Sequence, residues 1–292
     1  MALGDAVRAA ATLTFVALKR GLFLGDGPEY CGRVLFDDLG VQIPDEPQFR
    51  PRLTRLGEEE IIAALPRRRS NANKGDFGRV LIIGGGSGMP GAARLAGEAC
   101  LRAGAGLVTT ATAPENVATI AAGRPELICL GIHGAADLDA PLQAATVVAI
   151  GPGLGRSDWA RTLLDRALAC GKPLVVDADA LHLIAEHGWS TPAHAVMTPH
   201  PGEAGRLLGI SAAEVQSDRL AALQALTQRY PGVMVLKGAG TLIGARDRTA
   251  ALCERGNPGM AAPGMGDVLT GAIAGILAQC RDPFVAARAG VL

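Results

Sequence analysis

A glycine-rich stretch near the end of the chain places a carboxylate beside a pattern that binds phosphate. It runs from Gly256 to Asp267 as GNPGMAAPGMGD, and the apolar run VLTGAIAGIL follows at once. Dense glycine lets a backbone gather several N–H groups, and the helical spacing of the next run puts them at a helix N-terminus, which binds anions. Asp267 lies where the loop meets the helix. It is either a general base that takes a proton from a nucleophile, or merely an N-cap.

Two further motifs place a histidine and a lysine after strand-like runs. In TPHPGE, from Thr198 to Glu203, two prolines fix the backbone around His200, so we expect its ring to contact a ligand. Glu203 lies beside that ring, or is a first-turn residue favoured by the helix dipole. In KGAGT, from Lys237 to Thr241, the lysine can reach a phosphate and the glycines free neighbouring N–H groups. The order differs from a Walker loop, and the alternative is a solvated lysine in a hairpin.

Two glycine loops follow other strand-like runs. GSGMPG, from Gly86 to Gly91, fits the pattern G-x-G-x-x-G, but the next run, LVTTAT, lacks the acid that a dinucleotide fold of the dehydrogenase type requires. We therefore expect only a loop that lets a ligand approach the helix at Ala92 and Ala93. GPGLG, from Gly151 to Gly155, is a tight turn or a close approach to a bulky ligand, and its place on the same sheet edge favours the ligand.

Two carboxylates, Asp177 and Asp179, end the strand-like run PLVVDADAL. On a strand, carboxylates two residues apart face the same side, so they would repel or share a cation or a proton. If the backbone turns there, one of them caps the helix that begins at Ala180. One strand supplies too few ligands to predict a metal site, so we assign no metal-binding residue.

Apolar strand-like and helical runs alternate from Arg79 onward, which predicts an α/β fold. The strand-like runs are short and almost continuously apolar, as in a mainly parallel central sheet with helices on both faces. Residues 91–104, 158–171 and 211–230 read as helices, the last as one long helix. Ligands collect at the carboxyl ends of such strands, where almost all of these motifs fall. The predicted strands are RVLIIGG, LVTTAT, TVVAIGPG, PLVVDADAL, AVMTPH and VMVLKG.

Residues 1–44 differ from the rest and are predicted to form two strands joined by a glycine turn. The strand-like runs are LTFVALKRGLFLGDG and RVLFDDLGVQIP. Two strands alone do not form a stable domain, so they are either an edge of the main sheet or a remnant of something larger. A polar, proline-rich break at 44–52 and a charged helix, EEEIIAALP, lead into the alternating region.

The composition argues against several classes of function. The 292 residues carry zero formal net charge and only 3% are aromatic, which disfavours a nucleic-acid or membrane-surface partner. The six cysteines form no C-x-x-C pair and the five histidines no H-E-x-x-H motif, as expected in a reducing compartment without a zinc site. The apolar stretch at 6–24 lacks a cleavage-site pattern and carries charges, so a cytoplasmic location is expected.

Taken together and in this order, the motifs resemble those of the ADP/ATP-dependent NAD(P)H-hydrate dehydratase family, which has a ribokinase-like fold. The matching stretches, within residues 53–292, are KGDFGRVLIIGGGSGMPGAA, GPGLG, VVDADAL, TPHPGE, VLKGAGT and GNPGMAAPGMGDVLTG. Residues 5–44 resemble the tail of the NAD(P)HX epimerase domain that is often fused upstream. The resemblance implies a dehydratase domain at 45–292, incomplete at its C-terminus, after an epimerase remnant at 1–44.

The resemblance implies repair of NADH or NADPH whose nicotinamide ring has added water at C6, as the S-epimer. A nucleotide drives removal of the hydroxyl: ADP in bacterial members, which gives AMP and phosphate, and ATP in eukaryotic ones, with Mg²⁺ expected beside it. Family members are often tetramers, so a homotetramer is expected as an alternative to a monomer. Carried over by motif, Asp267 is the catalytic base and contacts the substrate with Ala93, Gly153 and His200. The implied nucleotide contacts are Lys237, Gly238, Ala239, Gly240, Thr241, Gly264, Met265 and Gly266.

The chain departs from the family pattern in three places. Pro263 replaces a usual glycine, which removes one N–H and stiffens the phosphate loop. The chain ends at AARAGVL, where the family continues through a further helix, and the upstream domain lacks its catalytic residues, so no epimerase activity is expected. Two alternatives stay open: a small-molecule kinase that phosphorylates a vitamin alcohol, and a catalytically disabled nucleotide-binding protein.

Overall fold

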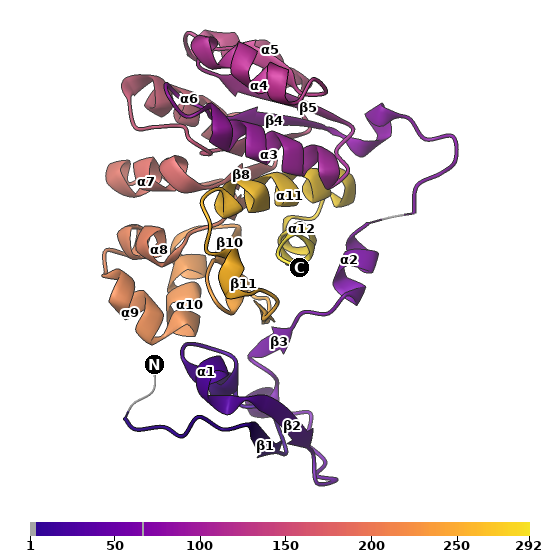
Figure 1. Cartoon of the computed structure of the whole chain (residues 1–292), viewed down its shortest axis with the longest axis vertical. Helices are drawn as coiled ribbons and strands as arrows, with labels where there is room; N and C mark the ends of the chain where they lie inside the picture. The colour runs from indigo at the N-terminus through magenta and orange to yellow at the C-terminus, as the bar shows by residue number, and fades with distance from the viewer. Residues whose placement is uncertain (1–3, 66) are drawn as a thin grey trace.

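One long, mainly parallel sheet organises the molecule (Figure 1). The computed structural model describes residues 4–65 and 67–292. Within them this sheet has ten strands, and neighbouring strands are parallel except in the pairs β10–β11 and β11–β12. In order across the sheet the strands are β3 (Leu53–Arg55), β12 (Ala250–Cys253), β11 (Thr241–Ala245), β10 (Val233–Leu236), β9 (Ala195–Met197), β8 (Leu174–Val176), β7 (Val147–Ile150), β4 (Arg79–Ile83), β5 (Leu107–Thr112) and β6 (Ile128–Gly131).

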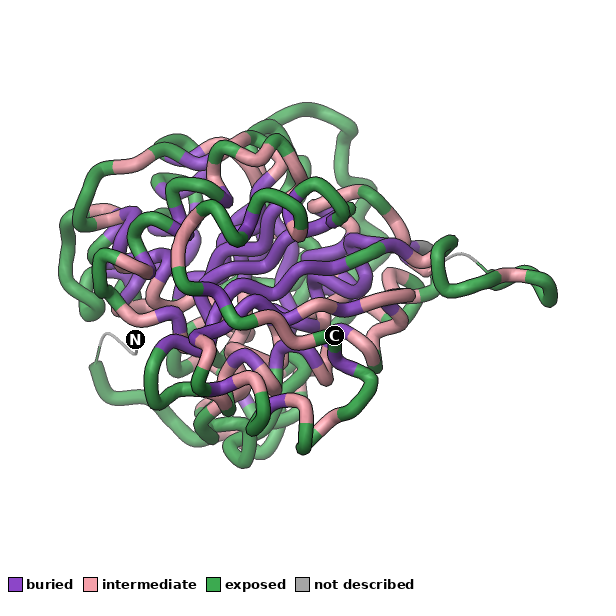
Figure 2. The backbone as a smooth tube through the Cα atoms, turned by 90° about the horizontal axis from the view of Figure 1, so that it is seen from above, coloured by how far each residue is buried: buried purple, intermediate pink, exposed green. Residues whose placement is uncertain are grey.

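Helices cover both faces of the sheet, because successive strand residues point to opposite sides. In β4, Val80 and Ile82 belong to one core and Leu81 and Ile83 to the other. Figure 2 shows the buried strands running through the middle of the molecule. The first face carries α2 (Glu59–Ala64), α3 (Pro90–Arg102), α4 (Val117–Gly123), α11 (Met265–Cys280) and α12 (Pro283–Gly290). The second carries α5 (Asp139–Ala144), α6 (Asp158–Leu168), α7 (Ala178–His187), α8 (Pro201–Leu208), α9 (Ala212–Ser217) and α10 (Arg219–Arg229).

The α/β class and the six predicted strands are confirmed, as β4, β5, β7, β8, β9 and β10. Four strands lie outside that prediction: β3, β6, β11 and β12. The single long helix predicted over 211–230 is wrong. Asp218 separates α9 from α10, and its side chain accepts a hydrogen bond from the N–H of Ala221, so that it caps α10. An aspartate that can cap a new helix competes with continuation of the old one.

The N-terminal segment forms a separate two-stranded sheet. β1 (Ala11–Phe15) and β2 (Arg33–Asp37) pair in parallel, and α1 (Gly27–Cys31) lies in the connection between them. The predicted glycine turn is therefore wrong, since a tight turn joins antiparallel strands only. These strands are not an edge of the main sheet either, because β3 and β6 are its outer strands. Phe23 and Leu24 attach the segment by packing against the main core.

Helix α11, which follows the glycine-rich loop, crosses α3 at close range. Gly271 and Gly275 of α11 face the backbone of α3. An added Cβ atom would lie 2.0 Å from the carbonyl oxygen of Ala96 at the first position, and 2.6 Å from that of Cys100 at the second. These two glycines lie about one helical turn apart, so together they let the two helices approach. A side chain at either position would push α11 away from α3.

We expect Gly271→Ala to destabilise the fold by about 1–3 kcal/mol, because the added methyl group overlaps a backbone oxygen. Gly91→Ala is the matched control, since Gly91 also lies in a helix but an added Cβ meets nothing within 4 Å. The control should keep the free energy of unfolding or raise it by up to about 1 kcal/mol. Urea unfolding followed by circular dichroism measures both variants, and equal stabilities would contradict the close crossing.

Candidate active site

A lysine–aspartate pair with a buried aspartate and a half-buried lysine lies at the carboxyl ends of β8 and β10. The Nζ atom of Lys237, after β10, lies 2.6 Å from Oδ1 of Asp177, which follows β8 and is 1% exposed. The other oxygen of Asp177 accepts a hydrogen bond of 2.8 Å from the hydroxyl of Thr270 in α11. Glu203, after β9, lies 3.7 Å from the same lysine nitrogen. Lys237 does lie in the hairpin between β10 and β11, but its ammonium group is paired and not solvated. Asp177 lies beyond its strand, which ends at Val176.

Asp267 lies in the first turn of α11, next to this pair. The N-cap of the helix is Gly264, so the interpretation of Asp267 as an N-cap is wrong. Burial, and after it the negative charge of Asp177, raises the pKa of the Asp267 carboxyl to about 6, whereas Lys237 acts in the opposite direction. A carboxylate with this pKa is a stronger base near neutral pH than an ordinary aspartate.

The start of α11 presents backbone N–H groups beside Lys237. The first intrahelical hydrogen bond runs from the N–H of Val268 to the carbonyl oxygen of Gly264, so the N–H groups in between are left for other acceptors. An added Cβ atom at Gly266 would lie 3.3 Å from Nζ of Lys237 and 3.4 Å from Oδ2 of Asp177. The predicted nucleotide contacts at 264–266 and Lys237 therefore lie side by side. An ammonium group next to a helix N-terminus favours an anion.

His200 caps helix α8 and leaves one ring nitrogen outside the cap. Its Nδ1 atom accepts hydrogen bonds from the N–H groups of Gly202 and Glu203, at 3.0 and 3.3 Å. The ring hydrogen of the neutral histidine is therefore assigned to Nε2. This atom lies 3.4 Å from Oε1 of Glu203, and the His200 side chain is 52% exposed. Burial, and after it the charge of Lys237, lowers the pKa of the ring, which favours its neutral form.

Glu203 combines a structural role with altered acidity. Its carboxylate accepts a hydrogen bond of 2.7 Å from the backbone N–H of His200, which completes a capping box. Burial raises the pKa of its carboxyl to about 7, although Lys237 opposes this shift. Both interpretations from the sequence hold, because the residue lies in the first turn of α8 and also beside His200.

An arginine that no motif marks fixes the loop from Lys237 to Thr241. Arg219, at the start of α10, is 5% exposed, and one of its terminal nitrogens donates to the carbonyl oxygens of Leu236, Lys237 and Gly240. Gly240 adopts φ 68°, a left-handed conformation that favours glycine. Sequence reasoning missed Arg219 because its partners are backbone carbonyls, which meet it only in the folded chain.

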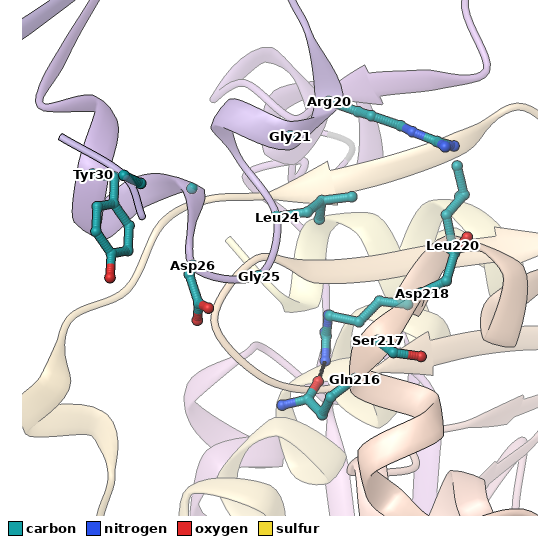
Figure 3. Close-up of a pocket in the computed structure, with 13 residues that line it drawn as sticks. Arg20, Gly21, Leu24, Gly25, Asp26, Tyr30, Gln216, Ser217, Asp218 and Leu220 are labelled. Atoms are coloured by element: carbon teal, nitrogen blue, oxygen red, sulfur yellow. Dashed lines mark hydrogen bonds between the residues drawn. The ribbon is translucent and has the colours of Figure 1, made fainter. Parts of the chain in front are cut away.

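A hollow of about 370 Å³, with Arg219 in its wall, lies where the N-terminal segment meets α9 and α10 (Figure 3). Its walls include Arg20 and Tyr30 from the N-terminal segment and Gln216 from α9. An added Cβ atom at Gly240 would lie 2.9 Å from the carbonyl oxygen of Phe23. The N-terminal segment therefore supports the predicted nucleotide loop from outside, although no predicted site residue lines the hollow.

The two glycine loops that follow β4 and β7 bind each other. Gly85 donates to the carbonyl oxygen of Pro152 at 2.9 Å, and Gly86 donates to that of Gly153 at 2.6 Å. Gly153 is partly exposed, and a Cβ atom added to it would lie 2.9 Å from the Cβ atom of Ala92. Ala93 lies behind this contact with no exposed surface. The G-x-G-x-x-G loop therefore packs against the GPGLG loop and is filled by protein on that side.

Asp179 connects the glycine loops to the charged cluster. Its carboxylate accepts a hydrogen bond of 2.9 Å from the N–H of Gly155. Its charge also contributes to the raised pKa of Asp267, after burial and Asp177. The structure thus brings the predicted residues into two adjoining groups. One contains Ala93 and Gly153, and the other contains His200, Lys237, Gly238, Ala239, Gly240, Thr241, Gly264, Met265, Gly266 and Asp267.

Neither a metal cluster nor a membrane-spanning helix is found in residues 4–65 and 67–292. No three His, Cys, Asp or Glu side chains in these ranges are arranged to hold a metal ion. Over the same ranges, no helix is both long enough and apolar enough to cross a membrane.

We expect the raised pKa of Asp267 to oppose folding as the pH rises. Folding lifts this pKa from its ordinary 3.8 to about 6, so the folded state binds the proton more tightly and the free energy of unfolding falls as the carboxyl ionises. Asp267→Asn removes this loss, and its stability relative to the wild type should rise by about 1–2 kcal/mol between about pH 4 and pH 7.5. Urea unfolding at both pH values measures the change. Asp165→Asn, at an exposed position in α6, should show no such pH dependence.

Comparison with known proteins places the chain among characterised relatives. The family model described as NAD(P)H-hydrate dehydratase matches residues 80–292. The bifunctional NAD(P)H-hydrate repair enzyme Nnr of Coxiella burnetii is 51% identical over 99% of this chain, and that of Escherichia coli is 45% identical over 98%. The chain spans 59% and 55% of the length of these two curated relatives.

Solved structures share the fold as well as the sequence pattern. The ADP/ATP-dependent NAD(P)H-hydrate dehydratase of Bacillus subtilis, co-crystallized with ATP/Mg2+, is 32% identical with a TM-score of 0.71, over 80% of this chain and 84% of that one. A ribokinase-like superfamily protein of Enterococcus faecalis is 33% identical with a TM-score of 0.76, over 84% and 87% of the two chains. These likenesses confirm the expected ribokinase-like fold. The chain belongs to the NAD(P)H-hydrate dehydratase family.

Proposed function

We propose that this chain removes the added water from the S-epimer of hydrated NADH or NADPH, with ADP as the phosphoryl donor. The proposal rests on the position of Asp267 in the first turn of α11, close to Lys237 and to the N–H groups that begin the helix. Its carboxyl has a raised pKa. A base beside an anion site is the arrangement that lets a hydroxyl attack a phosphate. Membership of the dehydratase family supports the substrate class.

In this mechanism Asp267 takes the proton of the C6 hydroxyl while that oxygen attacks the terminal phosphorus of ADP. The bond from this phosphorus to the bridging oxygen breaks, and AMP leaves. Lys237 and the N–H groups at the start of α11 stabilise the charge of the transferred phosphoryl group. The electron pair of the ring nitrogen then expels phosphate from C6, a proton leaves C5, and the dihydronicotinamide is restored.

The two groups of residues suggest where each substrate binds. We assign the hydrated cofactor to Ala93, Gly153 and His200, with the Nε2–H of His200 as a donor. Of these three, Ala93 has no exposed surface in this structure. We assign the nucleotide to the loop from Lys237 to Thr241 and to residues 264–266. Mg²⁺ would accompany the nucleotide, because phosphate groups are common partners of this ion in proteins.

We also propose that residues 1–44 are the C-terminal part of an epimerase domain and that 45–292 form the dehydratase domain; residues 1–3 lie outside the described part. The separate sheet of β1 and β2 supports this division. Its side chains Leu13 and Phe36 are 53% and 50% exposed, as expected for strands that pack against further chain. A homotetramer and a cytoplasmic location stay predictions.

Asp267→Asn should lower kcat at least about 100-fold, because the base is lost. ADP binding should persist, because Lys237 and the helix N-terminus remain in place. The assay follows the return of dihydronicotinamide absorbance from hydrated NADPH with ADP or with ATP, and calorimetry measures nucleotide binding. Recovery with only one nucleotide identifies the donor.

Failure of the folded wild-type chain to restore absorbance, while it binds nucleotide, would contradict the proposed function. Phosphate transfer to a stable vitamin alcohol would then identify a small-molecule kinase. Nucleotide binding without any turnover would identify a disabled relative.

His200→Asn separates ligand contact from helix capping. Asparagine is a good N-cap, so the variant should keep its stability, whereas His200→Ala should lose about 1 kcal/mol. We expect the asparagine variant to raise KM for hydrated NADPH about tenfold, because the Nε2–H donor is lost, and to leave KM for ADP nearly unchanged. Steady-state kinetics with each substrate varied in turn measure both values. An unchanged KM for hydrated NADPH would show that the ring serves only the cap.

A further inference from the structure

We propose that Asp177 is the positioning residue of the nucleotide site. One of its carboxylate oxygens holds the ammonium group of Lys237, and the other holds the hydroxyl of Thr270 on the helix that carries Asp267. This inference rests on the proposed function, and it assigns a role to a carboxylate whose partners the sequence left open. Asp177 acts through Lys237 and α11 and does not itself touch the reacting atoms.

The backbone around Asp177 turns its side chain toward these partners. Asp177 occupies the N-cap position of α7, yet its side chain makes no capping hydrogen bond. The next residue, Ala178, adopts φ 49°, a left-handed conformation that is costly for a residue other than glycine. The buried carboxylate makes no hydrogen bond to the nearest N–H groups, and the residue after it is strained. Its long-range partners therefore hold it in place. Those partners are Lys237 and Thr270.

The pair also fits closely against the start of α11. An added Cβ atom at Gly266 would lie 3.3 Å from Nζ of Lys237 and 3.4 Å from Oδ2 of Asp177. The ammonium group is therefore fixed beside the N–H groups that begin the helix, where the nucleotide phosphate is proposed to bind. Glu203 is a weaker counter-charge, because it lies at 3.7 Å and its carboxyl has a pKa of about 7.

A second consequence concerns the proton affinity of Asp267. The charged groups that act on its carboxyl are Asp177, the N-cap residue of α7, Asp179, in the first turn of α7, and Lys237, after β10. Asp177 makes proton loss from Asp267 harder, because two negative charges in a partly buried site repel. Removal of the Asp177 charge would therefore favour ionisation of Asp267, and an unpaired Lys237 would act in the same direction.

The experiment compares the full-length wild-type chain with Asp177→Asn, Lys237→Met and the double variant. Calorimetry gives the Kd for ADP, and we expect each single variant to weaken binding about tenfold. If Asp177 acts through Lys237, the double variant should bind ADP no more weakly than Lys237→Met alone. The double variant removes both charges, so it stays informative even if Asp177→Asn alone leaves the half-buried lysine unpaired and folds poorly.

The pH dependence of kcat/KM supplies a readout that a purely structural role would not change. In Asp177→Asn the acid limb should move to lower pH by about half a unit or more, because the like charge beside Asp267 is gone. Asp165→Asn, at an exposed position in α6, is the matched control and should keep both the Kd for ADP and the acid limb of the wild type.

Additive losses of ADP affinity in the double variant, or an unchanged acid limb in Asp177→Asn, would overturn the positioning role. The two proposals can fail separately. If the wild-type chain binds ADP but does not restore hydrated NADPH, the proposed function fails. The ADP affinities of the four proteins then still decide whether Asp177 positions Lys237.

Discussion

Parallel pairing of β4, β7, β8, β9 and β10 places the carboxyl ends of five strands along one edge of the sheet. Each of these strands is followed by a polar or glycine-rich turn, so residues far apart in the sequence meet at that edge. Asp177 follows β8, the helix capped by His200 follows β9, and Lys237 follows β10. The ion pair between Asp177 and Lys237 exists only because β8, β9 and β10 follow one another in this order across the sheet.

Burying so many charges works against stability, and the site limits that cost by pairing them. Asp177 and Lys237 neutralise each other, and Thr270 satisfies the second carboxylate oxygen. Burial raises the pKa of the carboxyls of Glu203 and Asp267, and Lys237 offsets this only in part. Buried ionisable groups whose pKa is shifted are typical of catalytic sites. The surrounding core supplies the stability that such a site lacks.

Close backbone packing holds this cluster in place from several sides. Gly271 and Gly275 let α11 lie against α3, which sets the position of the helix start that carries Asp267. On the far side, Arg219 binds three carbonyl oxygens around the loop that begins at Lys237, and the N-terminal segment lies against Gly240. Backbone packing at short range therefore supports the charged side chains of the site.

The sequence by itself determined the α/β class, the six central strands and the motifs that gather at the sheet edge. These follow from local apolar runs, glycine and proline, whose effects reach only a few residues. The tertiary structure alone decided that Asp177 holds Lys237, that Arg219 fixes the loop, and that β1 and β2 pair in parallel. It also decided that Asp267 lies beyond the N-cap and that Asp218 divides a predicted helix. Such contacts depend on which distant segments become neighbours, and no local pattern encodes that choice.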